Sequence, residues 1–433
     1  MTLSQRAKEL GIRYFLVSYA DLLGVSRAKL VPASAIDETA VVGAPFAGFA
    51  TWLDLTPADP DIFARPDPAS LIQLPWKPEV GWLASDLWMN GQPLAQAPRN
   101  VLRRQVAQAA GLGYELRTGV ECEFFLLTPD GGAVSDPWDR QVKPCYDQQA
   151  LTRRYDLIAE ICDSLLQLGW EPYQNDHEDA NGQYEINWKY ADAITTADRQ
   201  MFFKYLVKTL AEARGFRATF MPKPFTGLTG NGCHTHISLW NQAGDRNLFA
   251  DAGDASGLSP LAYQFLGGVL NSAEALAAIV NPTINSYRRL HAQTTTSGAT
   301  WSPNRISFSG NNRTHMVRIP DGGRIELRLV DGAANPYLSA AAILAAGLDG
   351  IAQQRRAGDQ HGFNVYTDSQ QAATLRKLPE TLLDALRCLE ADAVLPQALG
   401  SEFTTGYLKL KHAEWRDYNR QVSPWELQQT LDC

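Results

Sequence analysis

Four segments of this chain alternate ionisable with apolar residues at a period of two, which is the period of an extended strand. Residues two apart on a strand lie on the same face. The segment 324–329, Arg-Ile-Glu-Leu-Arg-Leu, therefore places its charges on one face and its aliphatic side chains on the other. Segments 120–125, 184–189 and 233–239 show related patterns. We expect these strands to share one sheet with a polar face.

The ionisable residues on this face are mainly glutamate, histidine and arginine. A solvated outer surface is the alternative for any single strand, but four such strands favour a polar site that lines a concave sheet. The carboxylates would repel one another if all were ionised, and divalent cations relieve such repulsion. Oxygen-rich ligands with few imidazoles suit Mg²⁺ or Mn²⁺ better than Zn²⁺. The candidate metal ligands are Glu121, Glu123, Glu178, Glu185, His234 and Glu326.

Arginines form a second group near the same strands. They are Arg289, Arg313, Arg318, Arg324 and Arg328. Arginines in such a group indicate clamps for phosphate or carboxylate oxygens, and metals with arginines are typical of phosphoryl transfer. The chain has no GxxxxGK[ST] segment, and the glycines of 227–232 precede a strand rather than a helix. These absences exclude Walker-type and dinucleotide-type phosphate loops, and the glycines suit a loop that approaches a small ligand closely.

Composition narrows the classes of partner. The net charge of -8 gives no basic footprint for nucleic acid. The six cysteines lie far apart without a CxxC pair, which indicates reduced thiols. The sequence shows no leader peptide and no apolar run long enough to span a bilayer. We therefore expect a cytoplasmic protein with neither nucleic acid nor membrane as a partner.

The order of elements predicts an α+β protein with a small first domain, residues 1–97, and a large second domain, residues 98–433. A stretch dense in proline and aspartate, 55–75, favours loops, and Pro98 suits the first turn of a helix. Expected helices span 4–10, 98–111, 151–168, 197–213, 259–279, 336–352 and 379–391. Expected β segments span 14–31, 117–127, 183–190, 216–222, 233–240, 315–319 and 324–330.

Taken together, these segments resemble the glutamine synthetase family. The matching stretches occur in the family's order and span nearly the whole chain. They are Glu121–Phe125, His177–Glu185, Phe220–Pro224, Gly230–His236, Asn281–Arg289, Asn312-Arg313 with Arg318–Pro320, Arg324–Arg328 and Asn335–Tyr337. The resemblance implies a β-grasp-like N-terminal domain and a catalytic domain with a curved antiparallel sheet flanked by helices. It also implies a homo-oligomer, commonly a dodecamer of two stacked hexamers, with active sites shared between neighbouring subunits.

The resemblance further implies ATP and two or more Mg²⁺ or Mn²⁺ ions. It assigns one metal to Glu123, Glu178 and Glu185, and the other to Glu121, His234 and Glu326. It places glutamate against Gly230, Arg289, Arg328 and Glu123, and ATP phosphates against His236, Ser238, Arg313, Arg318 and Arg324. ATP would phosphorylate the γ-carboxylate of glutamate, and an amine would then displace phosphate. Arg313 and Glu185 are expected to act in these steps.

Two departures from the family concern the amine. Members that use ammonia carry an acid in a Phe-Asp-Gly-Ser-Ser segment, where this chain has Ala47. The flap after Arg289 also differs: residues 290–301 contain no carboxylate. Losing both acids weakens an ammonium site, and an amine pocket of Ala47, Phe49, Trp52 and Asp179 leaves room for an apolar substituent. The pattern resembles the branch that contains γ-glutamylmethylamide synthetase, which joins glutamate to methylamine.

Several alternatives stay open at this stage. Asp54, Asp179 or His291 would capture ammonium if the chain were a glutamine synthetase that uses ammonia. A non-catalytic ring protein of the same fold would be expected to lose ligands, yet all are present. A guanidino kinase would share metals and arginines but not the whole order of motifs. His291 is the candidate for the missing flap base because histidine titrates near neutrality, and Tyr366 is interpreted as a surface tyrosine.

Overall fold

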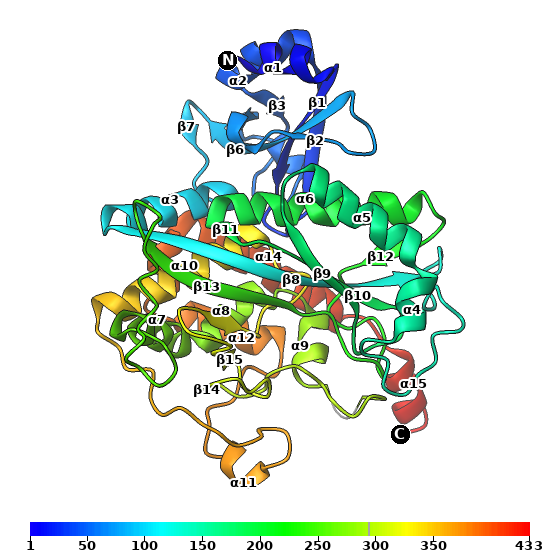
Figure 1. Cartoon of the computed structure of the whole chain (residues 1–433), viewed down its shortest axis with the longest axis vertical. Helices are drawn as coiled ribbons and strands as arrows, with labels where there is room; N and C mark the ends of the chain where they lie inside the picture. Colours follow the sequence, from blue (N-terminus) through cyan, green and yellow to red (C-terminus); the bar gives the residue numbers. More distant parts are fainter. Residues whose placement is uncertain (293–294) are drawn as a thin grey trace.

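Two sheets organise the molecule. The computed structural model in Figure 1 describes residues 1–292 and 295–433. A seven-stranded sheet within residues 14–93 lies at the top of the view, near the N-terminus. A nine-stranded sheet within residues 114–327 runs through the larger part below it. The expected small β-rich unit followed by a large α+β unit is therefore present. The boundary at residues 97 and 98 stays a prediction.

The strands of the N-terminal sheet are β1 Tyr14–Ala20, β2 Ser26–Pro32, β3 Ala44–Phe46, β4 Ile62–Pro66, β5 Ile72–Gln73, β6 Val80–Met89 and β7 Gln92–Pro93. Those of the large sheet are β8 Tyr114–Leu127, β9 Pro172–His177, β10 Gln183–Trp188, β11 Ala191–Asp192, β12 Arg217–Thr219, β13 Cys233–Asn241, β14 Phe308–Ser309, β15 Val317–Arg318 and β16 Ile325–Leu327.

The described helices are α1 Leu3–Leu10, α2 Ile36–Val42, α3 Pro98–Gly111, α4 Gln148–Arg153, α5 Tyr155–Gln167, α6 Ala193–Glu212, α7 Pro260–Asn271, α8 Ala273–Val280, α9 Ile284–Leu290, α10 Pro336–Ala352, α11 Ser369–Ala372, α12 Leu382–Ala391, α13 Leu395–Leu399, α14 Ser401–Asn419 and α15 Pro424–Thr430. No helix in the ranges 1–292 and 295–433 combines the length and hydrophobicity that crossing a bilayer requires.

Two of the predicted helices are interrupted in the structure. The helix expected over 151–168 is divided into α4 and α5 at Arg154, whose φ of -112° and ψ of 12° leave the helical region. Next to the break, Arg153 pairs with Asp136 at 2.6 Å. The helix expected over 259–279 is likewise divided at Ser272 into α7 and α8. The other predicted helices and strands are confirmed, with several strands shorter than expected.

Strand register builds the polar face that the sequence predicts. The large sheet runs in the order β14-β15-β16-β13-β8-β10-β9, and its pairs from β15 to β9 are antiparallel. Directly opposed residues lie on one face. Glu121 opposes His234, and Glu185 opposes Glu123 on one neighbouring strand and Asp176 on the other. The sheet therefore gathers acids from β8, β10 and β9 in one row.

The opposite face of the same strands is apolar. Cys122, Phe124 and Ile186 are almost fully buried. Helices α3 and α6 pack against β8, and the ring of Phe124 meets that of Phe203 on α6 edge-on, with centroids 6.3 Å apart. Burial of this face holds the strands in register, because a slip of one residue would exchange the two faces.

Arg99 on α3 joins the two parts of the chain. Its guanidinium is 4% exposed and bonds Asp198 of α6 through two hydrogen bonds of 2.9 and 2.8 Å. It also bonds Asp86 on β6 at 2.6 Å and Asp67, between β4 and β5, at 2.8 Å. One buried cation thus neutralises carboxylates from both units.

We predict that Arg99→Met lowers the stability of the protein strongly, by about 3–5 kcal/mol, because it leaves buried carboxylates without a cation. Thermal and urea unfolding would measure the change. Arg103→Met is the matched control: Arg103 is one turn further along α3, bonds the same Asp67 and Asp86, and is 41% exposed. We expect its loss to cost about 1 kcal/mol or less. Equal effects of the two substitutions would contradict the assigned role of Arg99.

Candidate active site

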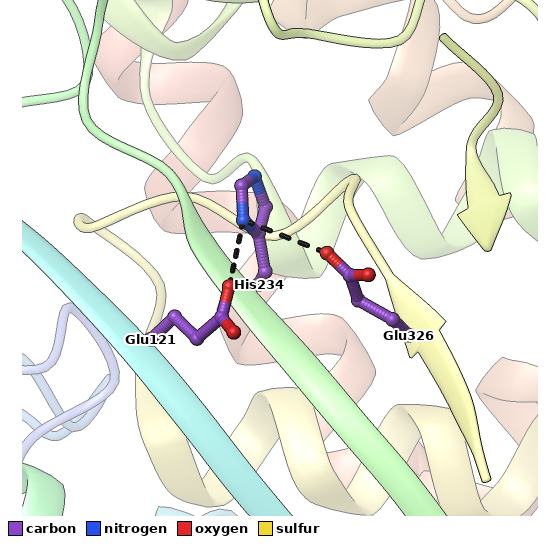
Figure 2. A group of neighbouring side chains, drawn as sticks. All are labelled: Glu121, His234 and Glu326. Atoms are coloured by element: carbon purple, nitrogen blue, oxygen red, sulfur yellow. Dashed lines mark hydrogen bonds and ion pairs between the residues drawn. The ribbon is translucent and has the colours of Figure 1, made fainter. Parts of the chain in front are cut away.

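The first carboxylate group lies across three neighbouring strands. Figure 2 shows Glu121 of β8, His234 of β13 and Glu326 of β16 pointing toward one another. The Nδ1 atom of His234 lies 3.2 Å from Glu121 Oε2 and 3.8 Å from Glu326 Oε1. One ligand atom from each residue lies within 4.8 Å of the others, which is the geometry of a metal site. The structure thus brings together the three residues that the sequence assigns to one metal.

Basic neighbours hold these two glutamates ionised. Burial raises the pKa of Glu121, but hydrogen bonds with His234 and His236 outweigh it and bring the pKa far below its usual range. Burial also works to raise the pKa of Glu326, and the charges of Arg328, His234 and His236 lower it overall. Both carboxylates are therefore ready acceptors for a cation at neutral pH.

The second group contains an acid that the sequence analysis missed. Asp176, Glu178 and Glu185 each offer an oxygen within 4.8 Å of the others. Asp176 comes from β9, a strand that the sequence analysis did not predict, and opposes Glu185 in register. The period-two pattern is absent there, since residues 172–177 read Pro-Tyr-Gln-Asn-Asp-His. Glu123, expected in this group, lies outside it in the structure.

The second group lacks the basic partners of the first. Burial, followed by the charges of Glu121 and Glu123, raises the pKa of Asp176 to about 6. Burial and neighbouring carboxylates raise the pKa of Glu178 and of Glu185 well above the usual range. Such a group binds either protons or a cation.

Glu123 lies between the two groups. Its Oε2 accepts hydrogen bonds from the backbone N–H of Gly232 at 2.7 Å and from Gln183 Nε2 at 3.1 Å. Its Oε1 lies 3.9 Å from His234 Nδ1. A Cβ at position 232 would come within 2.9 Å of Arg289 Nη2 and of His234 Nε2, so a larger residue here would displace these side chains.

The donor set fits divalent cations with oxygen ligands. Among the described residues, His234 Nε2 and Asp176 Oδ1 are buried polar atoms without a hydrogen-bond partner. Buried polar atoms usually have partners, and a bound ion is one explanation for those that lack them. Carboxylates with a single imidazole are the ligands of Mg²⁺ and Mn²⁺ rather than of Zn²⁺.

Three of the predicted arginines lie against the carboxylate groups or within the same core. Arg318 and Arg328 each bond one oxygen of Glu326, both at 2.6 Å. Arg289 is 3% exposed and donates to the backbone carbonyls of Leu329 and Arg328. Nearby Lys223 is also buried, and burial together with the charge of Arg289 lowers the pKa of its ammonium to about 8. The sequence analysis gave Lys223 no role, although it is part of the matched stretch 220–224.

A cavity of about 460 Å³ opens beside the first carboxylate group. It is lined by Glu121, His236, Ser238 and Arg324, and also by aromatic residues that the sequence analysis did not identify, Tyr173, Tyr190 and Trp240. Arg324 bonds Asp321 at the rim, with 43% of its side chain exposed. Imidazole, hydroxyl and guanidinium groups beside aromatic rings suit a phosphorylated ligand with an aromatic base.

Other predicted residues lie elsewhere. Arg313 is exposed on the loop between β14 and β15. His291 donates a hydrogen bond from Nε2 to the carbonyl oxygen of Pro379 at 2.7 Å, which fixes its ring outside both carboxylate groups. Part of the expected flap, residues 293–294, lies outside the described residues.

The predicted amine pocket is not assembled within the described part of one chain. Ala47, Phe49 and Trp52 belong to the N-terminal unit, and Phe49 and Trp52 are each 49% exposed. Asp179 is buried in the large unit and accepts hydrogen bonds from Thr229, Ser297 and Trp301. Among the described residues, no side-chain hydrogen bond or ion pair joins Asp179 to the other three.

The interpretation of Tyr366 as a surface residue is wrong. The side chain is half-buried, and its hydroxyl donates to the carbonyl oxygen of Ser302 at 3.4 Å. Burial raises the pKa of Tyr366, against the opposing charges of Arg328 and Arg289. The sequence pattern around this residue was polar and gave no sign that the loop folds back onto the site.

We predict that Mg²⁺ or Mn²⁺ stabilises the protein more at about pH 8 than at about pH 5. A carboxyl whose pKa is raised by folding contributes its stability below the ordinary carboxyl pKa, and loses it as the pH rises through the raised value. Asp176, Glu178 and Glu185 follow this rule, so their repulsion grows with pH until a cation relieves it. Thermal unfolding with and without metal at both pH values tests this. Glu185→Gln should reduce the difference, and an equal metal effect at both pH values would contradict the prediction.

The comparisons with known proteins point to one family, and the matched relatives cover nearly the whole chain. Residues 95–430 match the glutamine synthetase catalytic domain. A glutamine synthetase of Rhizobium meliloti (strain 1021) is 57% identical over 100% of this chain and 99% of its own length. A glutamate–methylamine ligase of Methyloversatilis universalis is 42% identical over 99% of this chain and 98% of its own length.

A solved structure gives the same result for the fold. The GmaS/ADP complex superposes with a TM-score of 0.97 and 61% identity, covering 100% of both chains. The carboxylate-lined sheet, its arginines and these full-length similarities lead to one conclusion: the chain belongs to the glutamine synthetase family.

Proposed function

We propose that this chain is an ATP-dependent ligase that joins a small alkylamine, methylamine above all, to the γ-carboxylate of L-glutamate. The observation that carries the ligase assignment is the pair of carboxylate groups on one sheet face, with Arg318 and Arg328 bonded to Glu326. A glutamyl phosphate intermediate concentrates negative charge, and fixed cationic groups stabilise such charge. Full-length similarity to glutamate–amine ligases supports the assignment.

The residues of the chain suggest separate roles around the reacting carboxylate. Glu121, His234 and Glu326 would hold one Mg²⁺ or Mn²⁺ ion, and Glu178 and Glu185 another, with Asp176 and Glu123 beside them. The ions supply charge neutralisation between the phosphate being transferred and its acceptor. Arg289, Arg328 and the loop at Gly230 would hold glutamate. His236, Ser238 and Arg324 would line the nucleotide cavity, and Arg318 would orient Glu326.

The substrate atoms balance in two steps. An oxygen of the γ-carboxylate attacks the terminal phosphorus of ATP, forming a C–O–P link and releasing ADP. The neutral amine nitrogen then attacks the acyl carbon, phosphate leaves with the C–O bond electrons, and the amide nitrogen loses one proton. Both steps move negative charge, which Arg318 and Arg328 and cations held by the two carboxylate groups would stabilise.

Methylamine is favoured as the acceptor by what the N-terminal unit presents. The position that carries an acid in ammonia-using members is Ala47, which is exposed beside the exposed aromatic rings of Phe49 and Trp52. An apolar surface of this kind gives little attraction to a bare ammonium ion but contacts a methyl group well. The name of the 42% identical relative, a glutamate–methylamine ligase, supports this choice.

We further propose that a second copy of the chain completes the amine pocket. Among the described residues of one chain, no hydrogen bond joins Asp179 to Ala47, Phe49 or Trp52, and the exposure of these three leaves them available to a neighbour. The resemblance to the family suggests a dodecamer of two stacked hexamers, in which each site takes residues from two subunits.

Ammonia is the second candidate acceptor. It is favoured by the name of the 57% identical relative, glutamine synthetase. In that case an acid other than one at position 47 would attract ammonium. Asp179 is poorly suited, since three neutral donors already occupy one of its oxygens.

An acceptor panel with the purified protein separates the two candidates. With glutamate, ATP and Mg²⁺, we expect kcat/KM for methylamine to exceed that for ammonia by at least about tenfold, the discrimination that one methyl group gives in a fitted pocket. Phosphate release gives the rates, and product mass identifies the amide. A higher kcat/KM for ammonia would overturn methylamine as acceptor while leaving the ligase assignment intact. Absence of ADP release with every amine would overturn the ligase itself.

We predict that Ala47→Asp shifts preference toward ammonia by several-fold, on the order of 1 kcal/mol of added attraction for a small cation. The matched control is Ala50→Asp, which adds the same charge to an exposed position three residues further along the same turn. The ratio of kcat/KM for the two amines is the measurement. Equal ratios in wild type and Ala47→Asp would contradict a role for position 47 in choosing the amine.

A further inference from the structure

Asp179 receives three hydrogen bonds on a single oxygen. Thr229 donates from its hydroxyl at 3.0 Å, Trp301 donates from its indole N–H at 2.6 Å, and the hydroxyl of Ser297 donates as well. The carboxylate is 7% exposed. Because the donors are neutral and already occupy Oδ2, Asp179 acts here as an anchor for the segment 297–301 rather than as an open acid.

Trp301 is linked to both carboxylate groups, through one intervening residue in each case. At its side-chain end it bonds Asp179, whose backbone N–H donates to Glu178 of the second group at 3.0 Å. At its backbone end its carbonyl oxygen accepts from Arg328 at 3.4 Å, and Arg328 bonds Glu326 of the first group. The indole is therefore fixed beside the region where the acyl phosphate of the proposed reaction would lie.

The backbone of Trp301 has an unusual conformation, and we attribute its persistence to these contacts. Its φ of +54° lies in the left-handed region, which bulky residues rarely adopt. Such conformations persist where surrounding contacts impose them. The neighbouring residue is held too, because the Ser302 carbonyl accepts from the Tyr366 hydroxyl at 3.4 Å. The indole thus has one fixed position.

We propose that Trp301, positioned by Asp179, is a specificity-determining residue that forms the wall of the amine pocket and selects an alkylammonium over ammonium. This inference rests on the proposed amine-ligase function and deepens it. Alkylamines are cations at neutral pH, as the lysine side chain is. The face of an indole ring attracts a cation, and this attraction is stronger for tryptophan than for tyrosine or phenylalanine. It also covers the methyl group, which ammonium lacks.

The test compares kcat and KM for methylamine and ammonia in Trp301→Leu, Trp301→Phe and Asp179→Asn. We expect Trp301→Leu to raise KM for methylamine on the order of tenfold, with a smaller change for ammonia. Trp301→Phe keeps an aromatic face and should retain the preference for methylamine in part. Asp179→Asn should move the preference in the same direction as Trp301→Leu, since it weakens the anchor. Glutamate KM should change less than about twofold in all three.

The control is Thr296→Ala. Thr296 is exposed in the same segment and its hydroxyl bonds the Gly227 carbonyl at 3.0 Å, away from Asp179. Its amine preference should equal that of wild type. Thermal midpoints identify any variant that fails to fold. If Trp301→Leu does not fold, the amine preferences of Asp179→Asn and Trp301→Phe test the role of Trp301. An unchanged methylamine-to-ammonia ratio, or equal losses for both amines, overturns the role of Trp301. If the wild type prefers ammonia, methylamine is overturned as the acceptor. The change in the methylamine-to-ammonia ratio between wild type and the variants still tests the role of Trp301.

Discussion

Carboxylates that face one another across hydrogen-bonded strands cannot all be ionised unless positive charge lies among them. The large sheet imposes this condition through its register, which sets Glu185 directly between Glu123 and Asp176. The apolar reverse face, packed on α3 and α6, keeps that register fixed. In part of the site, basic side chains neutralise the repelling carboxylates. In the rest of the site, the carboxylates remain without a basic partner and could bind a cation.

Some buried acids elsewhere in the molecule are paired with a basic side chain. Asp198 has Arg99, and Asp139 accepts from the ring of His177 at 2.6 Å. Asp176, Glu178 and Glu185 have no such cation within the described chain, and their pKa values rise accordingly, through burial first and neighbouring charge second. The contrast separates acids that hold the fold together from acids that are kept for a ligand.

The sequence predicted the polar sheet because period-two alternation is a local property that survives folding. It named Glu121, His234 and Glu326 together for the same reason, with the family resemblance supplying the assignment to one metal. Asp176 escaped because β9 lacks alternation and is recognisable only through its pairing with β10. The role of Arg99 was not predicted, because its position on a helix does not indicate that it bonds three acids that are distant in sequence.

Loop residues were the least predictable part of the site. The ring of His291 bonds a backbone carbonyl instead of lying at the reacting groups. Tyr366 and Trp301 are positioned by contacts that form only when separate loops meet. Composition and residue spacing therefore do not predict where these two side chains lie. The helical pattern likewise continues through the breaks at Arg154 and Ser272, so the sequence does not mark either of them.

The register of the acidic row also bears on how the chain reaches its folded state. β9 and β10 are antiparallel neighbours in sequence, so Asp176 and Glu185 meet through a local hairpin. Pairing β10 with β8 joins strands that are distant in sequence, and it brings Glu123 beside Glu185. In neutral solution this step is opposed by charge, and it is eased by a divalent ion that the row captures as it closes. A bound ion would then favour the paired strands over the open ones, so metal would stabilise this part of the sheet as well as serving the finished site.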